Sequence, residues 1–190
     1  MKKGRWIILI MLLVISGTSY AVNWGDSFSI TVSPAGDRGV IIDTTTINIG
    51  ELLPGTTYVH PYSIPVISTG TITDIEYTIK ADTSTPTSTL SLDGQADTEN
   101  EIVLQVLFNT VQPSAAAWEQ YGATTNLVTF TPKQVGDTTT ANQNFEGDED
   151  MDNLGLNVVR HLWFRLKSPL VWTIGTQQTI TITITAEPAN

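Results

Sequence analysis

Cysteine is absent from this 190-residue sequence, histidine occurs only twice, and nine basic residues stand against nineteen acidic ones, a formal net charge of -10. Without cysteine, a disulfide-stapled miniprotein, a cysteine-ligated zinc or iron–sulfur site and a c-type haem site are excluded. The acidic balance argues against binding to nucleic acid, because a phosphate-backbone binder needs a basic surface. A single domain is expected at this length.

Motifs that carry catalysis are also missing. The sequence contains no Gly-x-Ser-x-Gly elbow and no glycine-rich phosphate loop. Its two histidines, His60 and His161, have no motif around them that places a nucleophile or a second acid–base group nearby. We therefore expect that the protein is not an enzyme and that it needs no organic cofactor.

The first residues have the features of an export signal. Three basic residues within the first five positions precede an unbroken apolar run of ten, Trp6 to Ile15. This run is shorter than the roughly 20 residues of a membrane span, and Ser19 and Ala21 are small residues at the spacing that signal peptidase recognises. We predict a signal peptide over residues 1–21. A prepilin-type signal is the less favoured alternative, because Leu9 stands where such signals carry glutamate.

Cleavage after residue 21 would change the charge and the location of the protein. Six basic and nineteen acidic residues would remain, a net charge of -13. About 170 residues can bury enough apolar surface to fold without a disulfide. We expect a secreted protein, extracellular or at the cell surface, with no membrane span after cleavage.

The rest of the sequence has the pattern of β-strands. The segment from Gln178 to Thr185 alternates isoleucine and threonine without a break, so that its isoleucines share one face. The one segment that favours a helical turn is Ser114 to Tyr121, where three alanines follow a proline. Eight or nine strands are expected, and the predicted runs are 27–33, 40–49, 58–68, 72–81, 101–110, 127–134, 156–167 and 178–185.

These strands indicate the fold class. No crossover helices separate them, and this predicts an all-β, antiparallel β-sandwich of jelly-roll or immunoglobulin-like type, without a substantial helix. The 58–68 run contains Pro61 and Pro65, which predicts an edge strand or two short pieces. We expect three segments: the signal peptide, an N-terminal strand with a flexible joint over 22–39, and a sandwich domain over 40–190.

An acidic run is the sharpest local feature. Asp148, Asp150 and Asp152 have the spacing that opens a calcium-binding loop. The match then fails, because Asn153 stands at the glycine position and Val159 where a bidentate glutamate is needed. The three aspartates are candidate Ca²⁺ ligands, and a solvated acidic loop is the favoured alternative.

Tryptophans raise the question of sugar binding. Strand alternation places Leu162, Phe164 and Leu166 toward the core and Trp163 outward, in a predicted surface stripe with basic neighbours. An exposed aromatic face can stack on a sugar ring, which makes Trp163 and Trp172 candidate glycan contacts. Packing in the core or an interface is the alternative, and it is the usual place for tryptophan.

The N-terminal strand has two structural options. The mature chain would begin at Val22 and continue into an alternating strand over 27–33, and a turn-rich joint follows it. The predicted donor strand is 24–33. Such a strand can pair within its own sandwich, or it can complete the sheet of a neighbour, a non-closing contact that builds a fibre. The sequence does not separate the two. The predicted contact residues of a donor strand are Trp24, Phe28, Ile30 and Val32.

Three segments carry a resemblance to a known family. They read Asn48-Ile-Gly-Glu-Leu-Leu-Pro-Gly-Thr56, Arg160-His-Leu-Trp-Phe-Arg-Leu-Lys-Ser-Pro169 and Gly175-Thr-Gln-Gln-Thr-Ile-Thr-Ile-Thr-Ile184. In this pattern the chain resembles exported, threonine-rich β-sandwich proteins similar to camelysin-like subunits of biofilm-matrix fibres. The resemblance implies a jelly-roll fold and polymerisation by donation of an N-terminal strand. It implies no catalytic residues.

Together these observations predict a secreted structural subunit of an extracellular filament or surface layer. The expected partner is a second copy of the chain, joined by N-terminal donor-strand addition. The alternative from another class is a secreted carbohydrate- or surface-binding module, with a calcium-dependent adhesin as its variant. An exported hydrolase ranks third.

Overall fold

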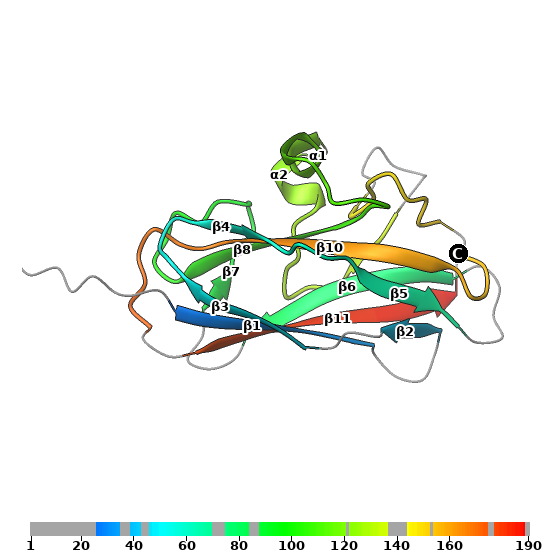
Figure 1. The fold of residues 1–190 in the computed structure, drawn as a ribbon, viewed down its shortest axis with the longest axis horizontal. Coiled ribbons are helices and arrows are strands. Elements are labelled where there is room, and N and C mark those ends of the chain that lie inside the picture. The colour runs from blue at the N-terminus through cyan, green and yellow to red at the C-terminus, as the bar shows by residue number, and fades with distance from the viewer. Residues whose placement is uncertain are drawn as a thin grey trace, which may run out of the picture.

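Two β-sheets packed face to face make up the fold (Figure 1). The computed structural model describes residues 26–34, 39–42, 46–69, 75–83, 88–120, 122–136, 144–152, 154–174 and 177–188. The predicted signal peptide and Trp24 lie outside these residues. In the described part of the chain, no helix has the length and apolar character needed to cross a bilayer.

The strand order within each sheet shows that both chain ends contribute to the same layer. The five-stranded sheet has the order β3 (Thr46–Leu52), β1 (Asp26–Pro34), β11 (Gln178–Pro188), β6 (Ile75–Thr83) and β9 (Lys133–Gln134). The six-stranded sheet has the order β2 (Val40–Ile42), β5 (Ile64–Ser68), β10 (Val159–Lys167), β8 (Glu101–Phe108) and β7 (Thr89–Leu90), and β4 (Thr57–Val59) also pairs with β10.

The predicted all-β sandwich is confirmed, with eleven strands among the described residues instead of the expected eight or nine. The runs 40–49 and 58–68 each form two strands, and the two-residue β7 had no signal in the sequence. Pro61 separates β4 from β5, so the second of the two options for this run is correct. A proline cannot donate to the strand ladder, which explains the break.

The expectation of purely antiparallel pairing is wrong at two places. β1 runs parallel to β11, and β7 runs parallel to β8. Alternation along a strand reveals which side chains share a face but not the direction of the neighbouring strand. β1 and β11 are far apart in the sequence, so no hairpin dictates their relative direction.

The core lies between the two sheets and follows the predicted alternation. Ile180, Ile182 and Ile184 are fully buried, whereas the threonines between them are partly exposed. They pack in one cluster with residues of the opposite sheet, among them Leu104, Val106, Leu162, Phe164 and Leu166. At roughly 1.5–3 kcal/mol for each buried aliphatic or aromatic side chain, this cluster is the main source of stability.

A short helix covers part of the outer face of the six-stranded sheet. It is α1 (Ala115–Gln120), which confirms the predicted helical turn, and α2 (Gly122–Thr125) follows it. Ser114 begins α1 as an N-cap, because its Oγ accepts a hydrogen bond of 3.2 Å from the backbone N of Ala117. Trp118 on α1 packs with Leu107 and Trp163 in a second, smaller apolar cluster.

Candidate subunit interface

The first strand fills an interior position of its sheet. β1 pairs in parallel with β11, from Phe28 opposite Gln178 to Pro34 opposite Ile184. On its other side it pairs antiparallel with β3, where Asp26 lies opposite Leu52. The single chain therefore shows the cis arrangement, in which this strand completes its own sandwich (Figure 1).

The centre of β1 belongs to the core. Ile30 is fully buried and lies in register with Ile180 on β11 and Ile47 on β3, and all three are part of the main apolar cluster. If β1 left this position, the apolar side chains of β3 and β11 would line an open groove. Among the predicted donor residues, Ile30 is the one whose side chain the structure describes.

A short connection leads from the end of β1 to the next described residue of the sandwich. After Pro34, four residues lead to Gly39, which has a φ of 81° and whose carbonyl accepts a hydrogen bond of 2.8 Å from the backbone N of Thr69. A Cβ at Gly39 would lie 2.8 Å from the Cβ of Ala186, so a larger residue is excluded there. Gly39 is thus a fixed point at the start of the segment that leads into β2.

The loop between β3 and β4 links the two sheets at one end of the sandwich. Gly55, with a φ of 68°, donates from its backbone N to the carbonyl of Pro169 at 2.8 Å. Ser168 Oγ accepts from the backbone N of Thr56 at 2.9 Å and donates to the carbonyl of Leu53 at 2.7 Å. The Leu-Pro-Gly step of the family resemblance is thus the turn that connects the sheets.

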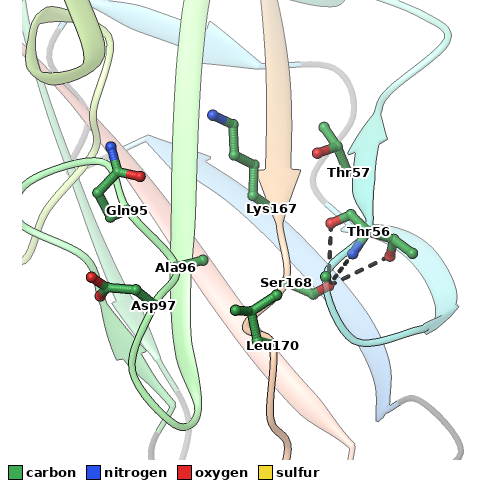
Figure 2. A pocket seen from close by; sticks show the side chains of 9 residues that line it. Thr56, Thr57, Gln95, Ala96, Asp97, Lys167, Ser168 and Leu170 are labelled. Atoms are coloured by element: carbon green, nitrogen blue, oxygen red, sulfur yellow. Dashed lines mark hydrogen bonds between the residues drawn. The ribbon is translucent and has the colours of Figure 1, made fainter.

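A shallow hollow of about 260 Å³ lies beside this turn (Figure 2). The residues that line it are Gly55, Thr56, Thr57, Gln95, Ala96, Asp97, Lys167, Ser168 and Leu170. Its lining combines charged and apolar groups: the cationic Lys167, the anionic Asp97 and the exposed side chain of Leu170.

The two tryptophans predicted as glycan contacts, Trp163 and Trp172, are buried. Trp163 points to the outer face of its sheet as predicted, but only 6% of it is exposed because α1 covers it. Its Nε1 donates to the carbonyl of Asn109 at 2.7 Å. Trp172 is 3% exposed and packs in the main core. The predicted surface stripe is therefore wrong, since alternation gives the face of a side chain but not what packs over it.

Arg165 holds α1 against the sheet, next to Trp163. Its Nη2 contacts Glu119 Oε1 at 2.7 Å, its Nε donates to Gln105 Oε1 at 2.8 Å, and its guanidinium lies 5.2 Å from the ring centroid of Trp118. The hydrogen bond from Arg165 lowers the pKa of Glu119 below its usual value. Arg165 was predicted to be a surface residue and is instead 6% exposed.

The three candidate calcium ligands do not converge. Asp148 accepts hydrogen bonds of 2.6 Å from the backbone N and the Oγ1 of Thr110, while Asp150 Oδ1 accepts from the backbone N of Asp152 at 3.0 Å. Among the described residues no group of three or more histidine, cysteine, aspartate or glutamate side chains is arranged to hold a metal ion. The acidic run instead ties its loop to the end of β8.

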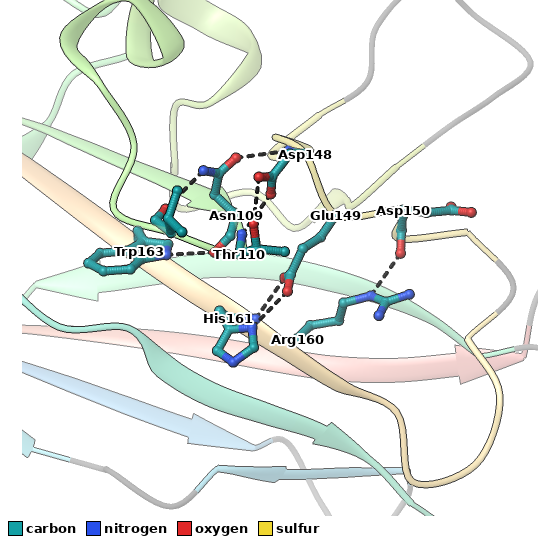
Figure 3. A network of polar contacts seen from close by, with 9 residues as sticks. Asn109, Thr110, Asp148, Glu149, Asp150, Arg160, His161 and Trp163 are labelled. Carbon is teal, nitrogen blue, oxygen red and sulfur yellow. Dashed lines mark hydrogen bonds and ion pairs between the residues drawn. The ribbon is translucent and has the colours of Figure 1, made fainter.

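Glu149 and His161 are joined by two hydrogen bonds in this loop (Figure 3). Glu149 is buried, and its carboxylate accepts hydrogen bonds from the backbone N of His161 at 2.7 Å and from the ring Nδ1 at 2.7 Å. His161 alternates outward as predicted, and its partner was missed because Glu149 appears in the sequence as one more residue of an acidic run.

A second missed group surrounds His60. Its ring stacks on Phe164, with centroids 4.8 Å apart and planes 9° from parallel, and its Nδ1 lies 3.0 Å from the hydroxyl of Tyr58. Burial lowers the pKa of His60 below 6.5. A lone histidine beside Pro61 gives no sequence signal of such a contact, because Phe164 lies more than a hundred residues away.

Compared with known families and with curated proteins, the sequence matches none. The geometry described above is therefore the basis for a functional proposal. Its central element is the interior position of β1.

Proposed function

We propose that the protein is a secreted structural subunit of an extracellular filament, in which β1 of one copy fills the position between β3 and β11 of the next. The observation that carries the proposal is that the first described strand of the sandwich occupies an interior position of its sheet, and only four residues lead from its last residue to Gly39. Cleavage after residue 21 would leave the other end of this strand without a connection to the body. The fibre-subunit resemblance of segments 48–56, 160–169 and 175–184 supports the same role.

The energetics favour exchange over simple release. Release of β1 would expose Ile30 and the groove that receives it, at a cost of roughly 1.5–3 kcal/mol for each apolar side chain, together with the hydrogen bonds to both neighbours. A donor strand from a second copy restores these contacts. The monomer, in which β1 pairs within its own sandwich, is then the form of the subunit before assembly. Exchange replaces the contacts of β1 with its own β3 and β11 by the same contacts in a neighbouring subunit.

The test is a deletion of residues 22–33, the predicted donor segment. The truncated chain should remain monomeric at concentrations at which the full secreted chain sediments as polymer, because it has an acceptor groove and no donor. Addition of a synthetic peptide of residues 22–34 should fill the groove and raise the melting temperature. Polymers that survive the deletion would contradict the proposal.

A matched control separates loss of the donor from general damage to the fold. Thr46→Ala alters an exposed residue of β3 beside the same groove and leaves both donor and core intact. This variant should polymerise as the full chain does. Equal loss of polymer in both variants would assign the effect to instability of the five-stranded sheet and not to strand exchange.

A further inference from the structure

β1 lies between two strands that run in opposite directions. β3 runs antiparallel to β1 and β11 runs parallel to it, so β3 and β11 run opposite to one another. Any strand between them has one parallel and one antiparallel neighbour, whichever way it points. A strand of either direction between β3 and β11 therefore has the same number of parallel and antiparallel neighbours.

The register of β1 also allows reversal. The paired stretch runs from Phe28 opposite Gln178 to Pro34 opposite Ile184, and its centre is Thr31 opposite Thr181. Reversal about this centre brings Ile30 opposite Ile182, which is again a fully buried residue of the core. On the β11 side even-numbered positions stay opposite even-numbered ones, so the strand keeps the same face toward the core. On the β3 side the register shifts between Phe28 and Ser29, and a reversed strand would have to accommodate this irregularity.

Exchange without reversal would join like ends of two subunits. In the single chain the C-terminal end of β1 lies opposite Ile184, and Gly39, where the body begins, lies beside Ala186 at the same end. Five Cα–Cα steps separate Pro34 from Gly39, a reach of at most about 18 Å. A donor in the original direction would thus hold its own body at the same end of the acceptor, and this symmetry favours a closed dimer.

Exchange with reversal would join unlike ends. Pro34 of the donor would then lie opposite Gln178 of the acceptor, at the end where β3 finishes with Leu52. The short connection would bring the donor body, which begins at Gly39, to that end. Each subunit would donate at one end and accept at the other, and this head-to-tail geometry propagates.

Apolar side chains are exposed at both of these ends. One patch, at the end of β10, consists of Leu53, Leu170 and Val171, and the other, near the start of β10, consists of Ile41, Leu156 and Val159. These six side chains are between 42% and 67% exposed. The hydrogen bond from the backbone N of Gly55 to the carbonyl of Pro169 joins the two loops of the first patch. In the second patch, Ile41 and Val159 both lie in register with Ile67.

The two patches are separated by the length of one strand. β10 has nine residues, which corresponds to roughly 30 Å. A single copy therefore cannot bring its own patches together, whereas a second copy stacked head to tail can. The four-residue connection, 35–38, has the length to hold the two unlike ends in contact.

On the basis of the proposed function, we propose that the donor strand enters the neighbouring subunit in the direction opposite to that of β1 in the single chain, antiparallel to β11, and that the two apolar end patches meet at each junction. The occupant of each patch is thus the opposite end of a second copy. Burial of both patches supplies the contact that the monomer lacks and drives exchange toward the polymer.

The test uses two pairs of introduced cysteines, since the chain has none of its own. In the register of the single chain Ser33 lies opposite Thr183, and after reversal it lies opposite Thr179. The double variants are Ser33→Cys with Thr179→Cys and Ser33→Cys with Thr183→Cys. Residues directly opposite in neighbouring strands are close enough for a disulfide.

In oxidised polymer, the 33–179 pair should give a ladder of covalently linked subunits, and the 33–183 pair should give none. Covalent links between subunits from the 33–183 pair alone would overturn the reversed direction and leave strand exchange intact. If neither pair links subunits in polymer that has formed, or if no polymer forms, strand exchange itself fails, and the proposed function and this inference fall together.

The end patches are tested separately by single charges. Leu170→Asp and Ile41→Asp should each raise the critical concentration for polymer about tenfold, because each places a carboxylate in the junction. Phe130→Asp is the control, because Phe130 is 43% exposed and belongs to neither end patch. The carbonyl of its neighbour Thr129 accepts a hydrogen bond from the backbone N of Ala81 on β6. An equal effect of all three variants, with unchanged monomer melting temperatures, would contradict the end-to-end contact.

Discussion

Ile30 and Ile180 lie opposite each other, both fully buried, in the parallel pair that joins the first strand of the sandwich to the last. This contact closes the five-stranded sheet around the start of the chain. It also makes the stability of the monomer depend on a strand that the proposed filament must exchange. The monomer and the polymer thus compete for the same apolar surface.

Truncation of this contact should destabilise the monomer strongly. Ile30→Ala leaves a cavity between β1, β3 and β11 and should lower the free energy of unfolding by about 2–5 kcal/mol. Chemical denaturation followed by tryptophan fluorescence measures this loss. A loss below about 0.5 kcal/mol, the range of ordinary surface substitutions, would show that β1 contributes little to the core.

The acidic loop should depend on one carboxylate more than on the three aspartates of the calcium-like run. Glu149→Ala removes both acceptors of His161 and should lower the free energy of unfolding by about 1–3 kcal/mol. Glu149→Gln keeps one side-chain oxygen as an acceptor, so it should lower the free energy of unfolding less than Glu149→Ala does. If Asp150→Asn destabilised the protein more than Glu149→Ala, measured by denaturation under the same conditions, the assignment would be wrong.

Protonation of His60 should weaken the fold in mild acid. Burial lowers its pKa, so the unfolded chain binds the proton at a higher pH than the folded chain does. The stability from this group is therefore complete above 6.5 and declines as the pH falls from 6.5 through the lowered pKa. The melting temperature of the His60→Phe variant, which preserves an aromatic ring on Phe164, should decline less between pH 7 and pH 5 than that of the parent chain.

A control isolates this contribution from the carboxylates that also titrate in acid. The decline in the parent chain and in His60→Phe should differ only in the interval in which His60 binds its proton. Identical profiles for the two chains would mean that the folded protein accommodates the imidazolium ring, against the packing of His60 on Phe164.

Polymer formation should increase with salt. The processed chain would carry a net charge of -13, so that subunits repel one another at low ionic strength. The Debye length falls from about 10 Å at 0.1 M to about 3 Å at 1 M salt, while apolar contacts at the junction persist. Light scattering across this range should show a falling critical concentration. A rising one would indicate junctions held by ion pairs and not by the apolar end patches.

The two-layer architecture of this fold could be predicted from the sequence, but the contacts at its candidate sites could not. The Ile180, Ile182 and Ile184 alternation predicts a core face because side chains on a strand alternate. The burial of Trp163 was not predictable, because it depends on α1, which arrives from another part of the chain. The partner of Asp148 is Thr110, 38 residues away. Such contacts follow from the tertiary structure, and spacing alone cannot reveal them.

Electron microscopy of the secreted, processed protein tests the central claim most directly. Strand exchange between copies predicts unbranched filaments whose axial repeat is close to the length of one sandwich, and which disappear when residues 22–33 are removed. A field of uniform single particles at every concentration and salt level would contradict it, and would leave β1 as an ordinary first strand of a monomeric sandwich.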